Sequence, residues 1–479
     1  MTDQTRQRST DDVRPVWNRR EFIRNGVAGV ASISFAAMLA RREADAAELL
    51  YSKDYGPVAP VDDLTTGLPL IALPPGFTCR SFGWTGQPMS DGQLTPGLHD
   101  GMAVVAAKGS QIVMVRNHEQ STGGLAFNAP AAYDPTHAHG GTTNLLFDTA
   151  TGKFTGSYAS LTGTLRNCNG GRTFWGSWLS CEETTDVSPN GMLHGWIFEV
   201  PGYGAGTGRP LYAMGRSVWE AVAVDPMSGI VYQTEDATPS ALYKFVPNRY
   251  GQLQLGGTLW ALKVRGVDDF NFSGLNHVYL DFPAGTTWDI EWVQVADVGA
   301  RNGRIYESAP GRAAFARLEG AYYDSGRIYF VSTSGGVAHQ GQVFCYDPIR
   351  ETLTMVFNSA GAGVGNNQAS NPDAITVSPR GGILLCEDGG DSIQRLRGLT
   401  QDGGTFVFAE NRMSFTAAQL QQADAALSAS GQVATLISPG NYTNTEWCGA
   451  CFHERWLFAN LQRPGITLAI TGPWENGAL

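Results

Sequence analysis

Short apolar runs alternate with polar steps along most of the chain, and six of these steps share one form. In each step an acidic residue or a cysteine stands among small residues, and a compact apolar run of strand length follows. The steps lie at residues 100–102, 168–170, 220–222, 319–321, 373–375 and 448–450. The strands that follow end in polar residues at 117–119, 181–183, 234–236, 333–335, 386–388 and 460–462. Six such units around one axis would bring these polar groups together.

The runs between the steps predict strands and turns far more often than helices. β-rich runs, most of them opened by turn residues, cover residues 109–115, 229–232, 326–331, 381–385 and 455–459, with outer strands at 242–245 and 342–347. Residues 416–428 predict one short helix at an edge, and the irregular spacing places insertions near 201–210 and 268–309. With 59 glycines and only 16% charged residues, the composition suits many short strands. We therefore predict an all-β, six-bladed β-propeller with insertions and a short helix; a pair of packed sheets is the alternative.

The first residues predict a targeting segment. Arg19 and Arg20 precede Phe22 and Ile23, a weakly apolar run covers residues 26–39, and small residues suited to cleavage stand at 44–46. This order resembles a bacterial twin-arginine export signal, whereas the alternative is a basic stretch before a core helix. We expect a signal peptide at 1–46 and a β-propeller phosphatase-like domain at 47–479. The expected product meets the twin-arginine export machinery, is exported folded, and is periplasmic or secreted without a stable membrane span.

Charge and cysteine content narrow the partners. Removing residues 1–46 takes away eight basic and six acidic residues, so the formal net charge changes from −11 to −13. Such an acidic domain argues against a nucleic-acid partner and suits Ca²⁺, which binds several carboxylates. The seven scattered cysteines do not predict a disulfide framework. Cys448 and Cys451 lack nearby partners for a zinc site, and whether they form a disulfide stays open.

The residues at the steps predict a metal site. Asp100, Glu220, Glu319 and Asp373 would open the inner strands, where clustered carboxylates repel one another unless cations neutralise them. Cys168 stands in the same ring, and its softer thiolate suggests a transition metal beside calcium.

One arginine stands next to these predicted ligands. Arg317 lies two residues before Glu319, so both side chains would face the same side of a strand. A guanidinium at that place suits the non-bridging oxygens of a phosphate ester.

Several longer motifs around these steps resemble the PhoX family of alkaline phosphatases, and the resemblance runs through most of the mature chain. The motifs lie at residues 82–86, 99–102, 167–171, 175–183, 219–222, 317–320, 464–466 and 470–474. The resemblance implies a six-bladed propeller that hydrolyses phosphate monoesters outside the cytoplasm. It also implies a cofactor of two Fe³⁺ ions and two to three Ca²⁺ ions, bridged by an oxo group.

The resemblance also implies roles for single residues. Cys168, Glu220 and Glu319 are expected to bind iron, and Arg317 is expected to hold the phosphate. The expected calcium ligands are Asp100, Glu182, Glu183, Glu235, Asp373, Glu387 and Asp388. The sixth step has no carboxylate, so Glu446 is a possible substitute. Ala374 departs from the family, which commonly has Asn after the aspartate that aligns with Asp373.

Two rival functions remain at this point. A calcium-dependent propeller hydrolase of another ester class, such as a lactonase, would keep the calcium but need no thiolate ligand. A non-catalytic propeller would use calcium structurally and bind a partner. The leading prediction is an exported, metal-dependent phosphatase, a monomer acting on small phosphate esters.

Overall fold

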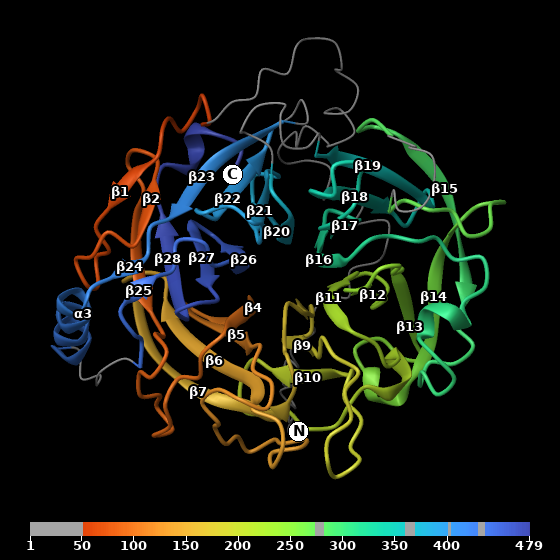
Figure 1. Cartoon of the computed structure of the whole chain (residues 1–479), viewed down its shortest axis with the longest axis horizontal. Coiled ribbons are helices and arrows are strands. Elements are labelled where there is room, and N and C mark those ends of the chain that lie inside the picture. The colour runs from red at the N-terminus through yellow and green to blue at the C-terminus, as the bar shows by residue number, and fades with distance from the viewer. Residues whose placement is uncertain (1–50, 274–281, 360–368, 401–403, 430–435) are drawn as a thin grey trace, which may run out of the picture.

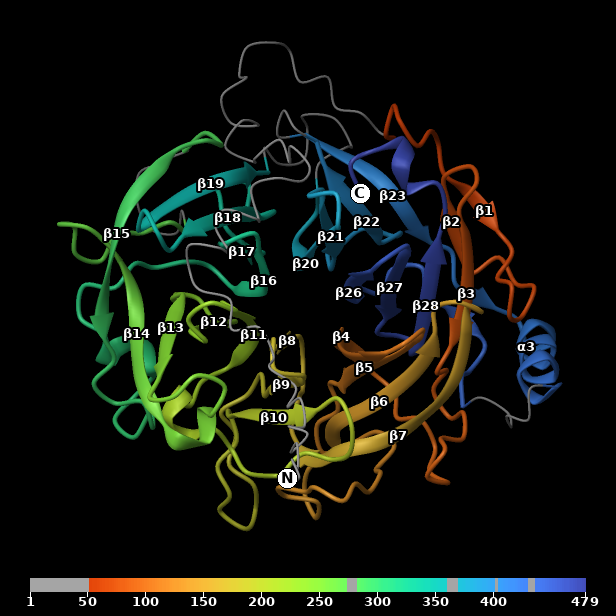
Figure 2. The ribbon, with the colours of Figure 1, turned by 180° about the vertical axis from the view of Figure 1, so that it is seen from behind.

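The computed structural model describes residues 51–273, 282–359, 369–400, 404–429 and 436–479. The predicted signal peptide lies outside these residues. The regular secondary structure of the described residues is almost entirely β-strand, and the sheets stand around a central axis (Figure 1). Each large sheet has an edge strand near the centre, and the nine-stranded sheet has both of its edge strands, β11 and β16, there. The same arrangement is visible from the opposite face (Figure 2). This all-β, propeller-like architecture confirms the predicted fold class and differs from two stacked sheets.

Three sheets have three or four strands each. The first consists of β4 (His99–Lys108), β5 (Gln111–His118), β6 (Gly140–Asp148) and β7 (Lys153–Thr164). The second consists of β8 (Gly171–Arg172), β9 (Ser177–Cys181) and β10 (Ile197–Pro201). The third joins β26 (Trp447–His453), β27 (Trp456–Leu461) and β28 (Ile466–Thr471) to β3 (Thr78–Phe82). Because β3 pairs antiparallel with β28, a strand near the start of the described chain and its last strand share one sheet.

Two larger sheets complete the ring. In one, the order is β1 (Ala59–Val61), β2 (Ile71–Leu73), β23 (Thr405–Asn411), β22 (Arg395–Leu399), β21 (Ile383–Glu387) and β20 (Pro372–Val377). The other begins with β11 (Trp219–Val224), β12 (Val231–Glu235), β13 (Tyr243–Pro247), β14 (Gly257–Val264) and β15 (Thr287–Gln294). It continues through β19 (Thr352–Asn358), β18 (Gln342–Asp347) and β17 (Arg327–Ser332) to β16 (Leu318–Asp324).

The innermost strands form a closed circuit around the axis. β4 contacts β8, β8 contacts β11, β11 contacts β16, β16 contacts β20, β20 contacts β26, and β26 returns to β4. Aromatic and aliphatic side chains fill the spaces around these strands, and Trp178, Trp219 and Trp447 are among the largest fully buried ones. The five sheets therefore supply six inner strands, two of them, β11 and β16, from the nine-stranded sheet.

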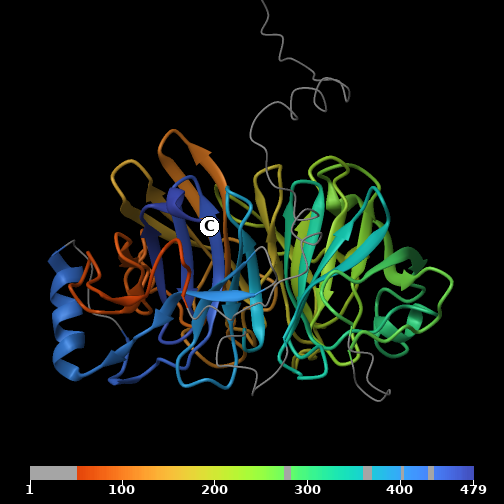
Figure 3. The same ribbon diagram turned by 90° about the horizontal axis from the view of Figure 1, so that it is seen from above.

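The remaining elements lie at the periphery. Helix α3 (Ala417–Ala429) stands outside the ring of sheets (Figure 3), beside the two-stranded sheet of β24 (Ser414–Phe415) and β25 (Gly440–Asn441) (Figure 1). Its Leu420, Ala423 and Leu427 are buried in the adjacent core, which confirms the predicted helix at an edge. Short 3-10 turns occupy Tyr212–Met214, Leu253–Leu255, Ile305–Ser308 and Trp474–Asn476. Among the described residues, no helix combines the length and apolar character that crossing a bilayer requires.

Candidate metal centre

Every inner strand is irregular at the same place. In β4, His99 pairs with His118, and regular pairing resumes only at Met102, so Asp100 and Gly101 bulge out of the ladder. The same shift occurs in β11, β16 and β20, and in β26 it falls one residue later; around β8 the bridges at Asn167 and Gly171 enclose a similar gap. The residue that follows the last regular pair, called a ring residue below, is the first bulged residue in five cases: Asp100, Cys168, Glu220, Glu319 and Asp373. Cys448 is the sixth ring residue by its equivalent place after Trp447, although it still pairs with Asn460 and the bulge falls on Gly449 and Ala450. The repeated bulge therefore presents six side chains of the predicted chemistry to one channel.

Glycine or alanine follows five of the six ring residues, because neighbouring inner strands are in close contact there. A Cβ added to Gly101 would lie 2.1 Å from the carbonyl oxygen of Asn169, and one added to Gly320 would lie 2.8 Å from the Cα of Ala374. Ala374 is itself buried against this neighbour. The departure from the family pattern thus falls at a position where the packing favours a small side chain.

A second repeat surrounds the ring residues. The residue two places before each ring residue is called a slot residue: Leu98, Arg166, Val218, Arg317, Asn371 and Glu446. In the second strand of each pair, one residue pairs with the residue just before the ring residue, and the residue that follows it is called a rim residue. The rim residues are Glu119, Glu183, Asp236, Thr333, Asp388 and Gln462. In all six strand pairs, the rim backbone N–H donates to the slot carbonyl at 2.9–3.3 Å. The fold therefore brings three sets of side chains to one end of the channel.

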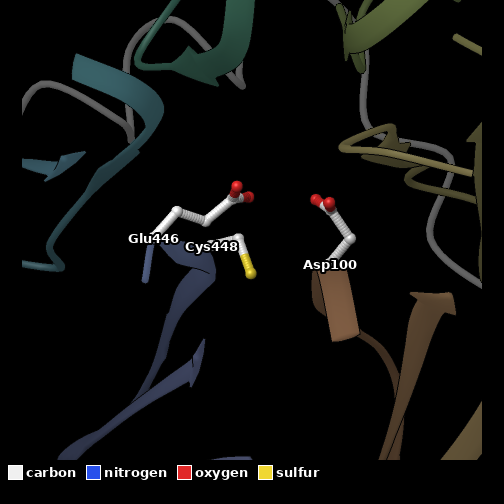
Figure 4. A group of neighbouring side chains, drawn as sticks. All are labelled: Asp100, Glu446 and Cys448. Atoms are coloured by element: carbon white, nitrogen blue, oxygen red, sulfur yellow. The ribbon is translucent and has the colours of Figure 1, made fainter. Parts of the chain in front are cut away.

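Ligand atoms meet in three groups, each within 4.8 Å. Cys168, Glu183 and Glu220 form the first group, Glu220, Glu319 and Asp373 form the second, and Asp100, Glu446 and Cys448 form the third. In the third group, the carboxylates of Asp100 and Glu446 and the sulfur of Cys448 point into the same space (Figure 4). Because Glu220 belongs to two groups, the first two are continuous.

The charges of these groups fit bound cations. Burial, together with Glu119 and Asp373, raises the pKa of Asp100 well above its usual range. Burial and neighbouring acids likewise raise the pKa of Glu220 and of Glu319. For Asp373, burial and Asp388 raise the pKa to about 7. Several buried carboxylates that resist ionisation side by side form a donor set that a divalent or trivalent cation would stabilise.

Cys168 is the softest donor of the first two groups. It is buried, and its Sγ lies 3.1 Å from the carbonyl oxygen of Trp219 and 3.4 Å from that of Glu220. Burial, with Glu220 and Glu183, raises the pKa of the thiol well above its usual range. A cation at this position would favour the thiolate, because metal binding requires the deprotonated form.

Arg317 borders the second group. Its Nε and Nη2 donate to the two carboxylate oxygens of Asp236 at 2.9 and 3.0 Å, and Nη2 also donates to Glu319 at 2.6 Å. Burial lowers the pKa of Arg317, but Glu319 and Asp236 outweigh it and raise the pKa overall. The side chain remains 43% exposed, so a charged group stands beside the ligand groups and within reach of solvent.

Three expected calcium ligands lie elsewhere. Glu182 is fully buried and accepts hydrogen bonds from the backbone N–H groups of residues 165, 195 and 196 and from His194. Glu235 accepts from Ser217, Tyr243 and Arg304, and Glu387 is paired with Arg397 and with the backbone of residue 370. Each of these glutamates pairs in the ladder with the residue before a ring residue, so its side chain faces away from the channel. The structure therefore corrects their expected placement.

The structure also brings forward residues outside the expected ligand set. Glu119, Asp236 and Gln462 are rim residues equivalent to Glu183 and Asp388, and Arg166 is a slot residue. Glu446, named from the sequence as the possible substitute at the sixth step, is also a slot residue and belongs to the third ligand group. The alternation of side chains along a strand could have indicated the rim residues, because the residue that follows the paired one faces the channel. This alternation can be applied only when the register at the bulge is known, because a shift of one residue exchanges the two faces of the strand.

The chain was compared with known proteins. The family model of alkaline phosphatase PhoX matches residues 53–155 and 148–465. Among solved structures, Pseudomonas fluorescens PhoX in complex with vanadate, a transition state analogue, has a TM-score of 0.63 and 16% identity, covering 90% of this chain and 99% of that one. A catalytically inactive virginiamycin B lyase from Staphylococcus aureus with quinupristin reaches a TM-score of 0.37 at 11% identity, covering 82% and 99%.

No curated protein matches the chain significantly. The solved PhoX structure supports the propeller-like fold. The family match covers most of the described residues and includes all six ring residues. The chain therefore belongs to the PhoX family of alkaline phosphatases.

Proposed function

We propose that this chain is an exported, metal-dependent phosphatase that hydrolyses phosphate monoesters in the channel of a six-bladed β-propeller. The observation that carries the proposal is the set of three ligand groups in one channel, with Arg317 beside them, in a member of a phosphatase family. The count of six blades rests on the closed circuit of six inner strands, with the nine-stranded sheet supplying two blades that join at β15 and β19.

The donor atoms of the groups indicate which cations they would hold. Cys168 with Glu183 and Glu220 offers a thiolate and carboxylates, which suits a transition metal such as iron. Glu220, Glu319 and Asp373 offer oxygen only and would share Glu220 with that site. This arrangement is compatible with the two Fe³⁺ and two to three Ca²⁺ that the family resemblance implies. Bound cations would supply Lewis-acid polarisation of the phosphoryl oxygens.

The protein's own residues would orient the ester. Asp236 and Glu319 fix the guanidinium of Arg317 through three hydrogen bonds. Among the described residues, none accepts a hydrogen bond from its Nη1, so this edge of the fork is available to a phosphoryl oxygen. A fixed donor beside the reacting group stabilises charge without reorganising during the reaction.

Export is the remaining part of the proposal. It rests on the arginine pair at 19 and 20 and on the cleavage-like residues 44–46, which lie outside the described residues. Sequencing the N-terminus of the periplasmic or secreted protein checks it: a start near residue 47 is expected, and an intact Met1 in the cytoplasm would contradict it.

Cys168→Ala tests the thiolate ligand. We expect the variant to lose iron and phosphatase activity while its blades stay folded, because a methyl group cannot replace the soft donor. Cys345→Ala is the matched control, since Cys345 is a buried cysteine on β18, away from the ligand groups. Metal analysis of both purified proteins gives the answer. Iron and activity retained in Cys168→Ala would reject the assignment, and calcium without iron in the native protein would favour a lactonase-like or non-catalytic propeller.

A further inference from the structure

Arg166 occupies the same place in its strand pair as Arg317 does in its own. Each arginine is a slot residue, two places before Cys168 and Glu319 respectively, and each has a φ of +49°. Their side chains are 42% and 43% exposed. The repeat of the fold therefore presents two guanidinium groups at equivalent depths of one channel.

The contacts of the two arginines are also alike. Arg166 donates from Nη2 to Glu183 at 2.6 Å and from Nε to Glu119 at 3.4 Å. Arg317 uses the same two nitrogens toward Asp236 and Glu319. Among the described residues, neither arginine donates a hydrogen bond from Nη1. Each side chain is thus fixed by two carboxylates and keeps one donor edge unused.

The backbone does not by itself require an arginine at these places. Leu98 and Asn371 occupy equivalent slots with the same left-handed conformation, at φ +47°. Left-handed φ values disfavour most side chains except glycine, asparagine and aspartate. An arginine in this conformation is therefore better explained by its side chain than by its backbone.

The two guanidinium groups serve different ligand groups. Arg166 contacts Glu183 of the group that contains Cys168, whereas Arg317 contacts Glu319 of the group that contains Asp373. The strand pair β11–β12, with its own rim residue Asp236, stands between the two slots in the circuit. When Arg317 holds the phosphoryl group, Arg166 is therefore available to bind another part of the same substrate.

We propose that Arg166 binds a second anionic group on the leaving group, so that the site prefers phosphate esters whose alcohol or phenol carries a carboxylate or another phosphate. This inference rests on the proposed phosphatase function and names its substrate class. A guanidinium edge binds either anion through charge-assisted hydrogen bonds, which are stronger than neutral ones. Arg166 is then a specificity-determining residue, while Arg317 contacts the phosphoryl group that is transferred.

A matched pair of substrates tests the proposal on the metal-loaded protein. 4-Carboxyphenyl phosphate and the methyl ester of its carboxyl group differ in one charge. Their leaving groups also differ in acidity, and this difference cancels when the preference of each variant is compared with that of the native protein. We expect the native protein to favour the acid in kcat/KM by about tenfold, which is one charge-assisted hydrogen bond. Arg166→Gln should remove this preference: at equal metal content, kcat/KM for the acid should fall about tenfold relative to kcat/KM for the methyl ester. Arg317→Gln should lower both values, and Arg249→Gln, at an exposed arginine, should change neither.

Binding without turnover gives a second readout. Arg166→Gln should weaken binding of 4-carboxyphenylphosphonate but not of inorganic phosphate, as measured by calorimetry on proteins of equal metal content. Arg166→Lys should keep part of the preference and serves if the glutamine variant does not fold. Equal losses on both esters, or weaker binding of inorganic phosphate, would overturn the inference and leave Arg166 a structural residue or part of the phosphoryl site. A native protein that released phosphate from neither ester would instead contradict the proposed function, and this inference with it.

Discussion

Glu182 and Glu183 are neighbours in the chain, yet their side chains lie in different surroundings. Glu182 points into the sheet, where its carboxylate accepts four hydrogen bonds from the chain at residues 165 and 194–196. Glu183 points into the channel, where it meets Cys168, Glu220 and Arg166. Successive strand residues face opposite sides, so one residue fixes the strand end and the next is available to a cation.

Exchanging either glutamate for glutamine should separate these roles. Glu182→Gln replaces one acceptor oxygen by an amide that faces N–H donors, so we expect a loss of about 2 kcal/mol in the free energy of unfolding with unchanged metal content. Glu183→Gln should lower metal content with a smaller effect on the metal-free protein. Urea unfolding and metal analysis measure both quantities. A Glu182→Gln protein that lost metal but kept its stability would contradict this division.

At the level of single residues, the predictable part was the ring. Asp100, Glu220, Glu319 and Asp373 sit beside small residues in motifs that mark strand openings, and the structure brings them to one channel. The less predictable part was the strand ends, where two acidic residues are adjacent and only the ladder register decides which faces inward. The composition of a strand end does not determine its register, because the same residues are compatible with either face of the strand pointing inward.

The bulge at the start of each inner strand is the element on which the channel depends. It turns a ring residue inward, and it brings the following residue against the next inner strand. Gly101 meets the backbone of Asn169, and Gly449, at a φ of +60°, meets the backbone of residues 100 and 102. Close backbone approach at these bulges leaves no room for a side chain.

Gly101→Ala tests this packing. The added Cβ would lie 2.1 Å from the backbone oxygen of Asn169, which cannot move without displacing the neighbouring Cys168. We therefore expect a loss of about 1–3 kcal/mol in the free energy of unfolding, together with weaker metal binding. Gly123→Ala is the control, because a Cβ there meets nothing within 4 Å. Thermal unfolding with and without chelator measures the effect. Wild-type stability and metal content in Gly101→Ala would show that the bulges are not tightly coupled.

Strands were easier to predict than their connections. The runs at 326–331 and 381–385 recur as β17 and β21 with small shifts, since alternating apolar residues between turn signals specify a strand locally. The three residue pairs between β15 and β19 connect two groups of strands into one nine-stranded sheet, and they join residues far apart in the chain. No local pattern encodes such a contact.

Across the whole molecule, the channel concentrates buried carboxyl groups whose ionisation the surrounding fold disfavours. Burial and Glu119 raise the pKa of Glu183 to about 10, and burial and Asp388 raise that of Asp373 to about 7. Ordinary values in an unfolded chain lie near 4. Without cations, the folded protein therefore binds more protons than the unfolded one between about pH 4 and pH 10.

This difference predicts how pH acts on the metal-free protein. A group with a raised pKa in the folded state contributes most to stability below its unfolded pKa, and the contribution is lost as pH rises through the folded value. Bound cations replace those protons. We therefore expect the gap in Tm between metal-loaded and chelator-treated protein to widen from pH 5 to pH 9. A gap that is constant or narrows with rising pH would show that cations do not neutralise these carboxylates.

The most direct measurement is release of inorganic phosphate from a simple monoester by the purified, folded protein before and after chelator treatment. We expect phosphate release from 4-nitrophenyl phosphate, its loss when the metals are removed, and its return when iron and calcium are restored together, because the ligand groups in the channel and Arg317 act on the same phosphoryl group. Fully metallated protein that released no phosphate, or release that chelation left unchanged, would contradict a metal-dependent phosphatase.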